Sequence, residues 1–130
     1  MKKILLSAAT ALILLGCNTP HGSLSTLITD VEAYNRDMVF QRYDVAAKKI
    51  DASVRHEWLA AMRSQGIRFS EIEVTDTSPC TPSDDQCYIV NAQVQWYSGN
   101  SPSIHNAILS TTWEFNITEK AWRIVKQVQE

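Results

Sequence analysis

The sequence has no excess of positive charge. It contains 12 Lys and Arg residues against 14 Asp and Glu residues, which gives a formal net charge of −2 at pH 7. Nucleic-acid binding requires a clustered positive surface, so a nucleic-acid partner is not expected. The sequence also lacks internal repeats and low-complexity segments. The length that follows residue 16, about 114 residues, suits one domain with one core.

The sequence also lacks an apolar run long enough for a typical transmembrane helix. Its longest run, residues 4–15, follows Met1-Lys-Lys3 and has the length of a signal-peptide core. The run ends in Leu14-Leu-Gly-Cys17, which resembles the lipobox of bacterial lipoproteins. This resemblance implies that residues 1–16 are a lipoprotein signal peptide and that Cys17 receives a diacylglyceryl group, with acyl chains such as palmitate. The alternative is an ordinary secretory signal with an accidental cysteine.

The residue that follows the cysteine bears on localisation. In lipoproteins of the enteric type an aspartate at this position favours retention in the inner membrane, whereas this chain has Asn18. The resemblance therefore implies the outer membrane, with the protein facing the periplasm. Loss of residues 1–16 removes Lys2 and Lys3 and leaves a formal charge of about −4. Residues 17–23 form a lipidated tether, of which residues 18–23 span about 20 Å when extended. Residues 24–130, the predicted domain, therefore lie close to the membrane.

Cysteine is scarce, and each cysteine has an expected role. Acylation of Cys17 leaves Cys80 and Cys87, which flank the loop between two predicted strands. In an oxidising periplasm they are expected to form a disulfide. No histidine lies near the pair in sequence, so a zinc site is disfavoured, and free thiols are the other alternative. No cofactor or metal is predicted.

Helical spacing of apolar residues predicts three helices before any strand. The first runs from a cap at Ser23 or Ser25 to about Phe40. The second covers residues 45–50 and is expected to be capped by Asp44. The third opens at Ser53, and Gly66 is expected to end it.

Alternation with a period of two then predicts four antiparallel strands. The first covers residues 67–75, with a bulge expected between Phe69 and Ile72. The next two, residues 87–97 and 104–117, form a hairpin that pairs Tyr97 with Ile104. A second turn at residues 118–121 is expected to pair Ile117 with Trp122 and Phe115 with Ile124. These registers give one inward face, which comprises Tyr88, Val90, Ala92, Val94, Trp96, Ala107, Leu109, Thr111, Trp113, Phe115, Trp122 and Ile124.

The order of these elements resembles the NTF2-like superfamily, also called the cystatin-like α+β cone. The resemblance rests on Asp44-Val-Ala-Ala-Lys-Lys-Ile50, Trp58-Leu-Ala-Ala-Met62, Trp113-Glu-Phe115 and Trp122-Arg-Ile124, a pattern similar to that of small exported lipoproteins with this fold. It implies an α+β fold in which three N-terminal helices pack on a curved four-stranded antiparallel sheet. It further implies a pocket between helices and sheet, and a convex face that often contacts another protein.

The resemblance raises the question of catalysis in that pocket. Superfamily enzymes such as ketosteroid isomerase and scytalone dehydratase place an aspartate, histidine or tyrosine there. The predicted inward face has no carboxylate; His105 is expected at the rim, Asp37 on a helix surface and Asp44 at a cap. We therefore predict no catalytic residue. The candidate pocket residues are Tyr34, Tyr88, Trp96, His105, Leu109, Trp113 and Trp122, although aromatic side chains at such positions are more often simple core.

The outward face suggests a protein contact. Its apolar and uncharged members, which also fit an ordinary exposed sheet, are Ile89, Gln93, Tyr97, Ile108 and Val125, among polar neighbours that include Arg123 and Gln127. We expect a non-catalytic interaction or assembly module that binds a protein partner, or a second copy, through this face. The alternatives are a binder of a small apolar ligand and, third, an enzyme.

Overall fold

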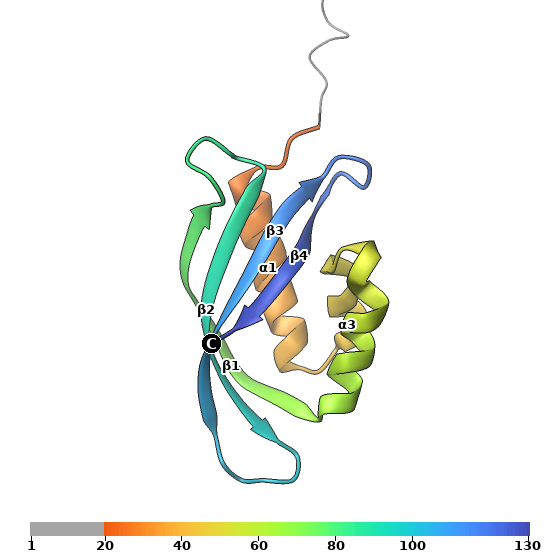
Figure 1. The fold of residues 1–130 in the computed structure, drawn as a ribbon, viewed down its shortest axis with the longest axis vertical. Helices are drawn as coiled ribbons and strands as arrows, with labels where there is room; N and C mark the ends of the chain where they lie inside the picture. The colour runs from red at the N-terminus through yellow and green to blue at the C-terminus, as the bar shows by residue number, and fades with distance from the viewer. Residues whose placement is uncertain (1–19) are drawn as a thin grey trace, which may run out of the picture.

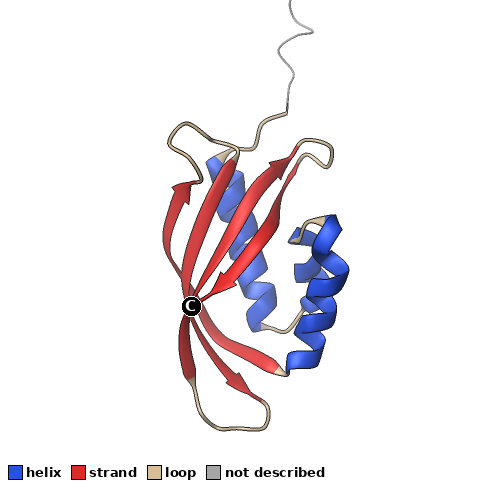
Figure 2. Ribbon diagram, viewed as in Figure 1, coloured by secondary structure: helices blue, strands red, loops and turns tan. Residues whose placement is uncertain are grey.

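A computed structural model describes residues 20–130, which form an α+β domain (Figures 1 and 2). The elements in order are α1 (Leu24–Val39), α2 (Tyr43–Ala46), the 3₁₀ helix η2 (Ala47–Lys49), α3 (Ala52–Gln65), β1 (Ile67–Pro79), β2 (Cys87–Ser98), β3 (His105–Asn116) and β4 (Ala121–Gln129). The strands make a single antiparallel sheet in the order β1-β2-β3-β4. Among the described residues, no helix has the length and apolarity needed to cross a membrane. The predicted signal peptide and Cys17 lie outside the described residues.

The ends of the two long helices follow from their capping residues. The Ser23 side chain accepts a hydrogen bond from the Thr26 backbone N–H, as an N-cap should. At the other end of the helical region, Gly66 adopts a left-handed conformation with φ 64° and ends α3, as predicted. The cap of α3 is Asp51, whose carboxylate accepts from the Ser53 N–H at 3.1 Å, so this helix starts just before the predicted residue.

The predicted cap of the second helix is wrong. Helix α2 begins at Tyr43, and its N-cap residue, Arg42, makes no side-chain capping bond. Asp44 therefore lies inside the first turn, where its carboxylate still interacts favourably with the partial positive charge at the helix N-terminus. Its side chain is exposed and forms an ion pair with Arg63 of α3, which connects the two helices at the surface.

The β2–β3 hairpin has the predicted register. Val94 lies opposite Ala107, and Tyr88 lies opposite Trp113, so the apolar faces of both strands coincide. The predicted irregularity in the first strand is also confirmed, because the β1–β2 register shifts between Phe69 and Glu71. A second shift follows between residues 74 and 76, and β1 extends further than predicted, to Pro79.

The predicted register of the β3–β4 hairpin is wrong by two residues. Phe115 pairs with Trp122 rather than with Ile124, because the turn occupies residues 117–120. A shift of two preserves the face of every side chain, so Trp122 and Ile124 are still buried. The register shifts again between Thr112 and Trp113, where β4 contains one extra residue. Beyond this point the side chains of β4 that would have faced outward face inward, and the reverse.

The core lies between α1 and the inward face of the sheet. Figure 2 shows the helices on one side of the strands. The largest fully buried side chains come from both layers and are Leu27, Tyr34, Met38, Ile50, Val94, Trp113, Trp122 and Ile124. Tyr34 meets Trp113 edge-on with ring centroids 5.8 Å apart, a favoured aromatic geometry. The interior is thus filled by aliphatic and aromatic side chains from both layers.

Candidate functional site

The chain that enters the domain is fastened before the first helix begins. The Gly22 N–H donates to Gln86 Oε1 at 2.8 Å, and Gln86 Nε2 donates back to the Gly22 carbonyl at 3.1 Å. A Cβ atom at residue 22 would lie 2.5 Å from ring atoms of both Phe115 and Trp122. Only glycine allows this approach. We call this arrangement of Gly22 and Gln86 the tether clasp.

The disulfide loop holds the clasp in place. Cys80 and Cys87 are disulfide-bonded, as predicted, and the Cys80 N–H also donates to the Cys87 carbonyl at 2.9 Å. Within the loop the Gln86 N–H donates to Asp84 Oδ1 at 2.8 Å, and the Gln86 carbonyl accepts from the Phe115 N–H at 3.0 Å. The backbone of Gln86 is therefore fixed on both sides, which orients its side chain toward Gly22.

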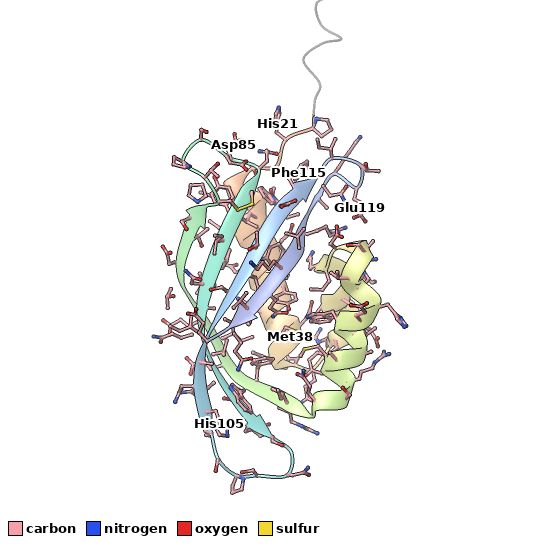
Figure 3. The ribbon with its side chains drawn as sticks, viewed as in Figure 1. His21, Met38, Asp85, His105, Phe115 and Glu119 are labelled. Atoms are coloured by element: carbon pink, nitrogen blue, oxygen red, sulfur yellow. A yellow bond between two sulfur atoms is a disulfide. The ribbon has the colours of Figure 1, made fainter. Side chains whose placement is uncertain are left out.

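The clasp lies at one end of the molecule. Figure 3 shows His21, Asp85, Phe115 and Glu119 gathered there, with His105 toward the opposite end. Residues 20–23, the described part of the predicted tether, therefore lie at this end. Sequence reasoning missed Gln86, since a single polar residue in a loop carries no signal of a partner 64 positions away.

The candidate pocket residues do not gather around one cavity. They form separate contacts along the sheet: Tyr34 with Trp113, Tyr88 with Trp122 at 5.9 Å, and Trp96 stacked on His105 at 4.3 Å between ring centroids. His105 is exposed, while Trp113 and Trp122 are buried in the core. Leu109 alone among them lines the cavity described next.

A cavity of about 230 Å³ lies between α3 and the sheet. Its lining residues are Trp58, Ala61, Met62, Gln65, Ile67, Phe69, Leu109, Gln127 and Gln129. Gln127 reaches it because the register shift in β4 places this residue opposite Thr111, on the inward side, and not on the outward face as predicted. Its Oε1 accepts from Trp58 Nε1 at 3.0 Å. The lining offers apolar surface and amide groups, with no carboxylate or histidine.

The Tyr34 hydroxyl is buried near Gln127, one of the residues that line this cavity. It has no hydrogen-bond partner of good geometry among the described residues. Burial raises the pKa of Tyr34 well above its usual value, an effect that the nearby Gln127 amide offsets only in part. The hydroxyl therefore stays protonated and is poorly suited to act as a base.

Other candidate acid–base groups lie away from the cavity. Asp37 is half-buried on α1, and Asp44 is exposed and paired with Arg63. Neither lines the cavity between α3 and the sheet. Within residues 20–130 there is also no group of three or more His, Cys, Asp or Glu side chains that could hold a metal ion.

The outward sheet face has a hollow of about 460 Å³. Its lining residues are Glu71, Glu73, Gln93, Val94, Gln95, Asn106, Ala107, Ile108 and Glu130. Cross-strand pairing brings residues of three strands together in this hollow, since Glu73 lies opposite Gln93 and Gln93 lies opposite Ile108. The prediction of a largely uncharged face is thus incomplete, because β1 adds glutamates to it.

The five residues predicted for the partner face divide between two places. Ile89 and Tyr97 are half-buried, and Gln93 and Ile108 are exposed, all on strands β2 and β3. Val125 instead lines a separate groove of about 340 Å³ between α3 and β4, together with Val54 of α3. The register shift beside Val125 is the reason, since it breaks the alternation from which the face was predicted.

Comparison with solved structures gives a distant similarity. No protein-family model matches the chain, and no curated protein matches it. Among solved structures, the intermembrane-space region of the chloroplast protein ARC6 aligns with a TM-score of 0.49 and 11% sequence identity. The alignment covers 85% of this chain and 98% of that one. A similarity this weak assigns neither a family nor a function.

Proposed function

We propose that this protein is a membrane-anchored lipoprotein that faces the periplasm and acts as a non-catalytic interaction or assembly module. In this proposal the domain has the NTF2-like cone fold. Three helices before a bulged first strand and a long antiparallel meander support that assignment. The protein uses its helices to close the inward face of the sheet and leaves the outward face for a partner.

The hollow on the outward face carries the proposal. It combines an exposed apolar side chain, Ile108, with the amide of Gln93 and a border of glutamates. Interface cores take apolar and amide groups, while charged borders direct orientation and association rate. A partner that presents an apolar residue flanked by Lys or Arg fits this surface.

The tether clasp supports a role close to the membrane. Fastening at Gly22 leaves only residues 17–21 between the proposed acyl anchor and the folded domain, which is a reach of about 17 Å. Free rotation of the domain is thereby reduced. An assembly factor gains from this arrangement because partners in the same membrane meet a surface that is already positioned.

A photo-crosslinking amino acid at Ile108 tests the partner face in intact cells. We expect a specific crosslinked species that is absent when the same group replaces Ala60, an exposed residue on α3. Glu73→Lys should weaken that crosslink several-fold through charge reversal at the border, whereas Glu57→Lys on α3 should leave it unchanged. Equal crosslinking from residues 108 and 60 would argue against a partner on the outward face.

The cavity beside α3 favours a second candidate function, the binding of a small apolar ligand. Its volume of about 230 Å³ suits only a small molecule, and Trp58 with Gln127 offers one polar contact. A ligand there should change Trp58 fluorescence, and Ala61→Trp, which fills the cavity, should abolish that change. Ligand binding that survives Ala61→Trp would exclude this cavity as the site.

A further inference from the structure

Strand β4 forms one edge of the sheet, and its outer side is covered over only part of its length. Beside Ile124 the segment before α3 takes the place of a neighbouring strand: Ile50 makes a parallel bridge there, and the Asp51 N–H donates to the Ile124 carbonyl at 2.9 Å. Within the described part of the chain, no backbone hydrogen bond occupies the outer side of residues 126–130. This end of β4 is marked by the C-terminus in Figure 1.

The inner hydrogen bonds determine which groups point outward. Glu130 exchanges both backbone bonds with Ile108, at 2.8 and 3.0 Å, so its N–H and C=O face β3. In an antiparallel ladder such bonding alternates along the strand. Val128 and Lys126 therefore also bond inward, whereas Gln127 and Gln129 direct their N–H and C=O groups outward.

We propose that a second copy of this chain pairs antiparallel with residues 126–130 of β4 and joins the two sheets into one. In a two-fold pairing the outward-bonding residues must face each other. When the axis passes through Val128, Gln127 of one copy lies opposite Gln129 of the other, and four backbone hydrogen bonds form.

Charge complementarity selects this register. With the axis at Val128, Lys126 of each copy lies opposite Glu130 of the other, so both charges meet an opposite charge. With the axis at Gln127, Lys126 faces Val128 instead, and with the axis at Lys126 the two lysines face each other. Opposite charges at paired strand positions stabilise a sheet, and like charges destabilise it. A lysine alone would protect an exposed edge from pairing, but Glu130 makes this edge complementary to itself.

The side chains around the edge also fit a second strand. Val128 is 41% exposed, and at the two-fold axis it would be covered by the same residue of the other copy. The groove of about 340 Å³ between α3 and β4 ends at Lys126 and Gln127 and leaves space for the incoming Gln129 side chain. The outward faces of both copies then form one surface, which extends the proposed partner face.

Membrane attachment adds a geometric consequence, which rests on the proposed function. Antiparallel pairing places the two tether clasps at opposite ends of the joined sheet. Both anchors can reach one membrane only if the strands lie along its plane. Anchoring in one leaflet also raises the effective concentration of the copies, which matters because a five-residue pairing buries little surface.

Cysteine crosslinking of the full chain in the cells that produce it tests the interface. Val128→Cys should yield a covalent dimer on a non-reducing gel that disappears on reduction, because paired residues that are not hydrogen-bonded have Cα atoms about 4.5 Å apart. Gln93→Cys is the matched control, since Gln93 is also exposed on the outward face but lies on an interior strand. It should give no dimer.

Charge reversal tests the register. In the Val128→Cys background, Lys126→Glu or Glu130→Lys should each lower dimer yield about tenfold, since two-fold symmetry places two like-charged contacts in every dimer. The double exchange should restore the yield to within about twofold.

Three results would overturn the inference. A dimer from Gln93→Cys without one from Val128→Cys would place the contact between copies on the sheet face. No dimer from either variant would exclude edge pairing. The proposed function would not be affected, because the Ile108 crosslink tests it separately. A charge exchange that fails to restore the Val128→Cys dimer would exclude this register.

Discussion

Replacement of Cys17 by serine should abolish acylation, so that the protein no longer fractionates with membranes through an acyl anchor. Thioether attachment of the diacylglyceryl group needs the thiol, and serine cannot replace it. Each buried CH₂ of an acyl chain contributes about 0.8 kcal/mol, so loss of two chains removes effectively all membrane affinity. Metabolic labelling with a fatty-acid analogue, followed by membrane fractionation, measures both effects.

Asn18→Asp provides the matched control for this experiment. It keeps the cysteine and should keep full labelling, while the proposed sorting rule predicts a shift from the outer to the inner membrane. Equal labelling of the wild type and Cys17→Ser would exclude Cys17 as the acceptor. If Asn18→Asp is fully labelled but does not move to the inner membrane, the predicted outer-membrane localisation is wrong and the predicted acylation still holds.

The sheet illustrates how far sequence patterns determine a fold. The β2–β3 register was predictable because its turn length and the apolar faces of both strands agree on one pairing, as with Val94 and Ala107. The β3–β4 register was not, because a shift of two residues leaves every apolar residue on the same face. Alternation cannot distinguish the pairing of Phe115 with Trp122 from that with Ile124.

Irregular backbone accounts for the misplaced side chains on β4. A single extra residue near Val125 turns Gln127 inward to Trp58. Nothing in the local composition marks this position, since bulges respond to the curvature of the whole sheet. Asp44 was misassigned for a related reason, because a residue suited to capping can equally well make an ion pair within the first turn.

The candidate site was predictable only where chemistry restricts the partners. The predicted export and acylation of Cys17 made Cys80 and Cys87 the expected disulfide pair, and the structure contains that disulfide. The tether clasp depends instead on the approach of Gly22 to Phe115 and Trp122, which follows from tertiary packing. The acidic border of the outward hollow went unnoticed because the predicted face omitted β1, whose register contains two irregularities.

Removal of the disulfide should lower stability by roughly 2–3 kcal/mol. Joint replacement of Cys80 and Cys87 by serine frees a short loop in the unfolded chain, and loop entropy sets the size of the effect. Urea unfolding of the oxidised protein and the variant measures it as a shift in midpoint at unchanged slope. Alkylation of the unreduced, denatured wild type should modify neither cysteine.

The clasp predicts a second consequence of the same change. Without the disulfide the loop no longer fixes Gln86, so protection of the Gly22 amide from hydrogen exchange should fall. Gln86→Ala separates the two effects: it removes the clasp but keeps the disulfide, and should cost about 1 kcal/mol, the net value of a hydrogen bond or two. If the serine variant retains wild-type protection at Gly22, the loop does not hold the tether. If it retains the wild-type midpoint, the covalent link adds nothing to a loop already ordered by its own hydrogen bonds.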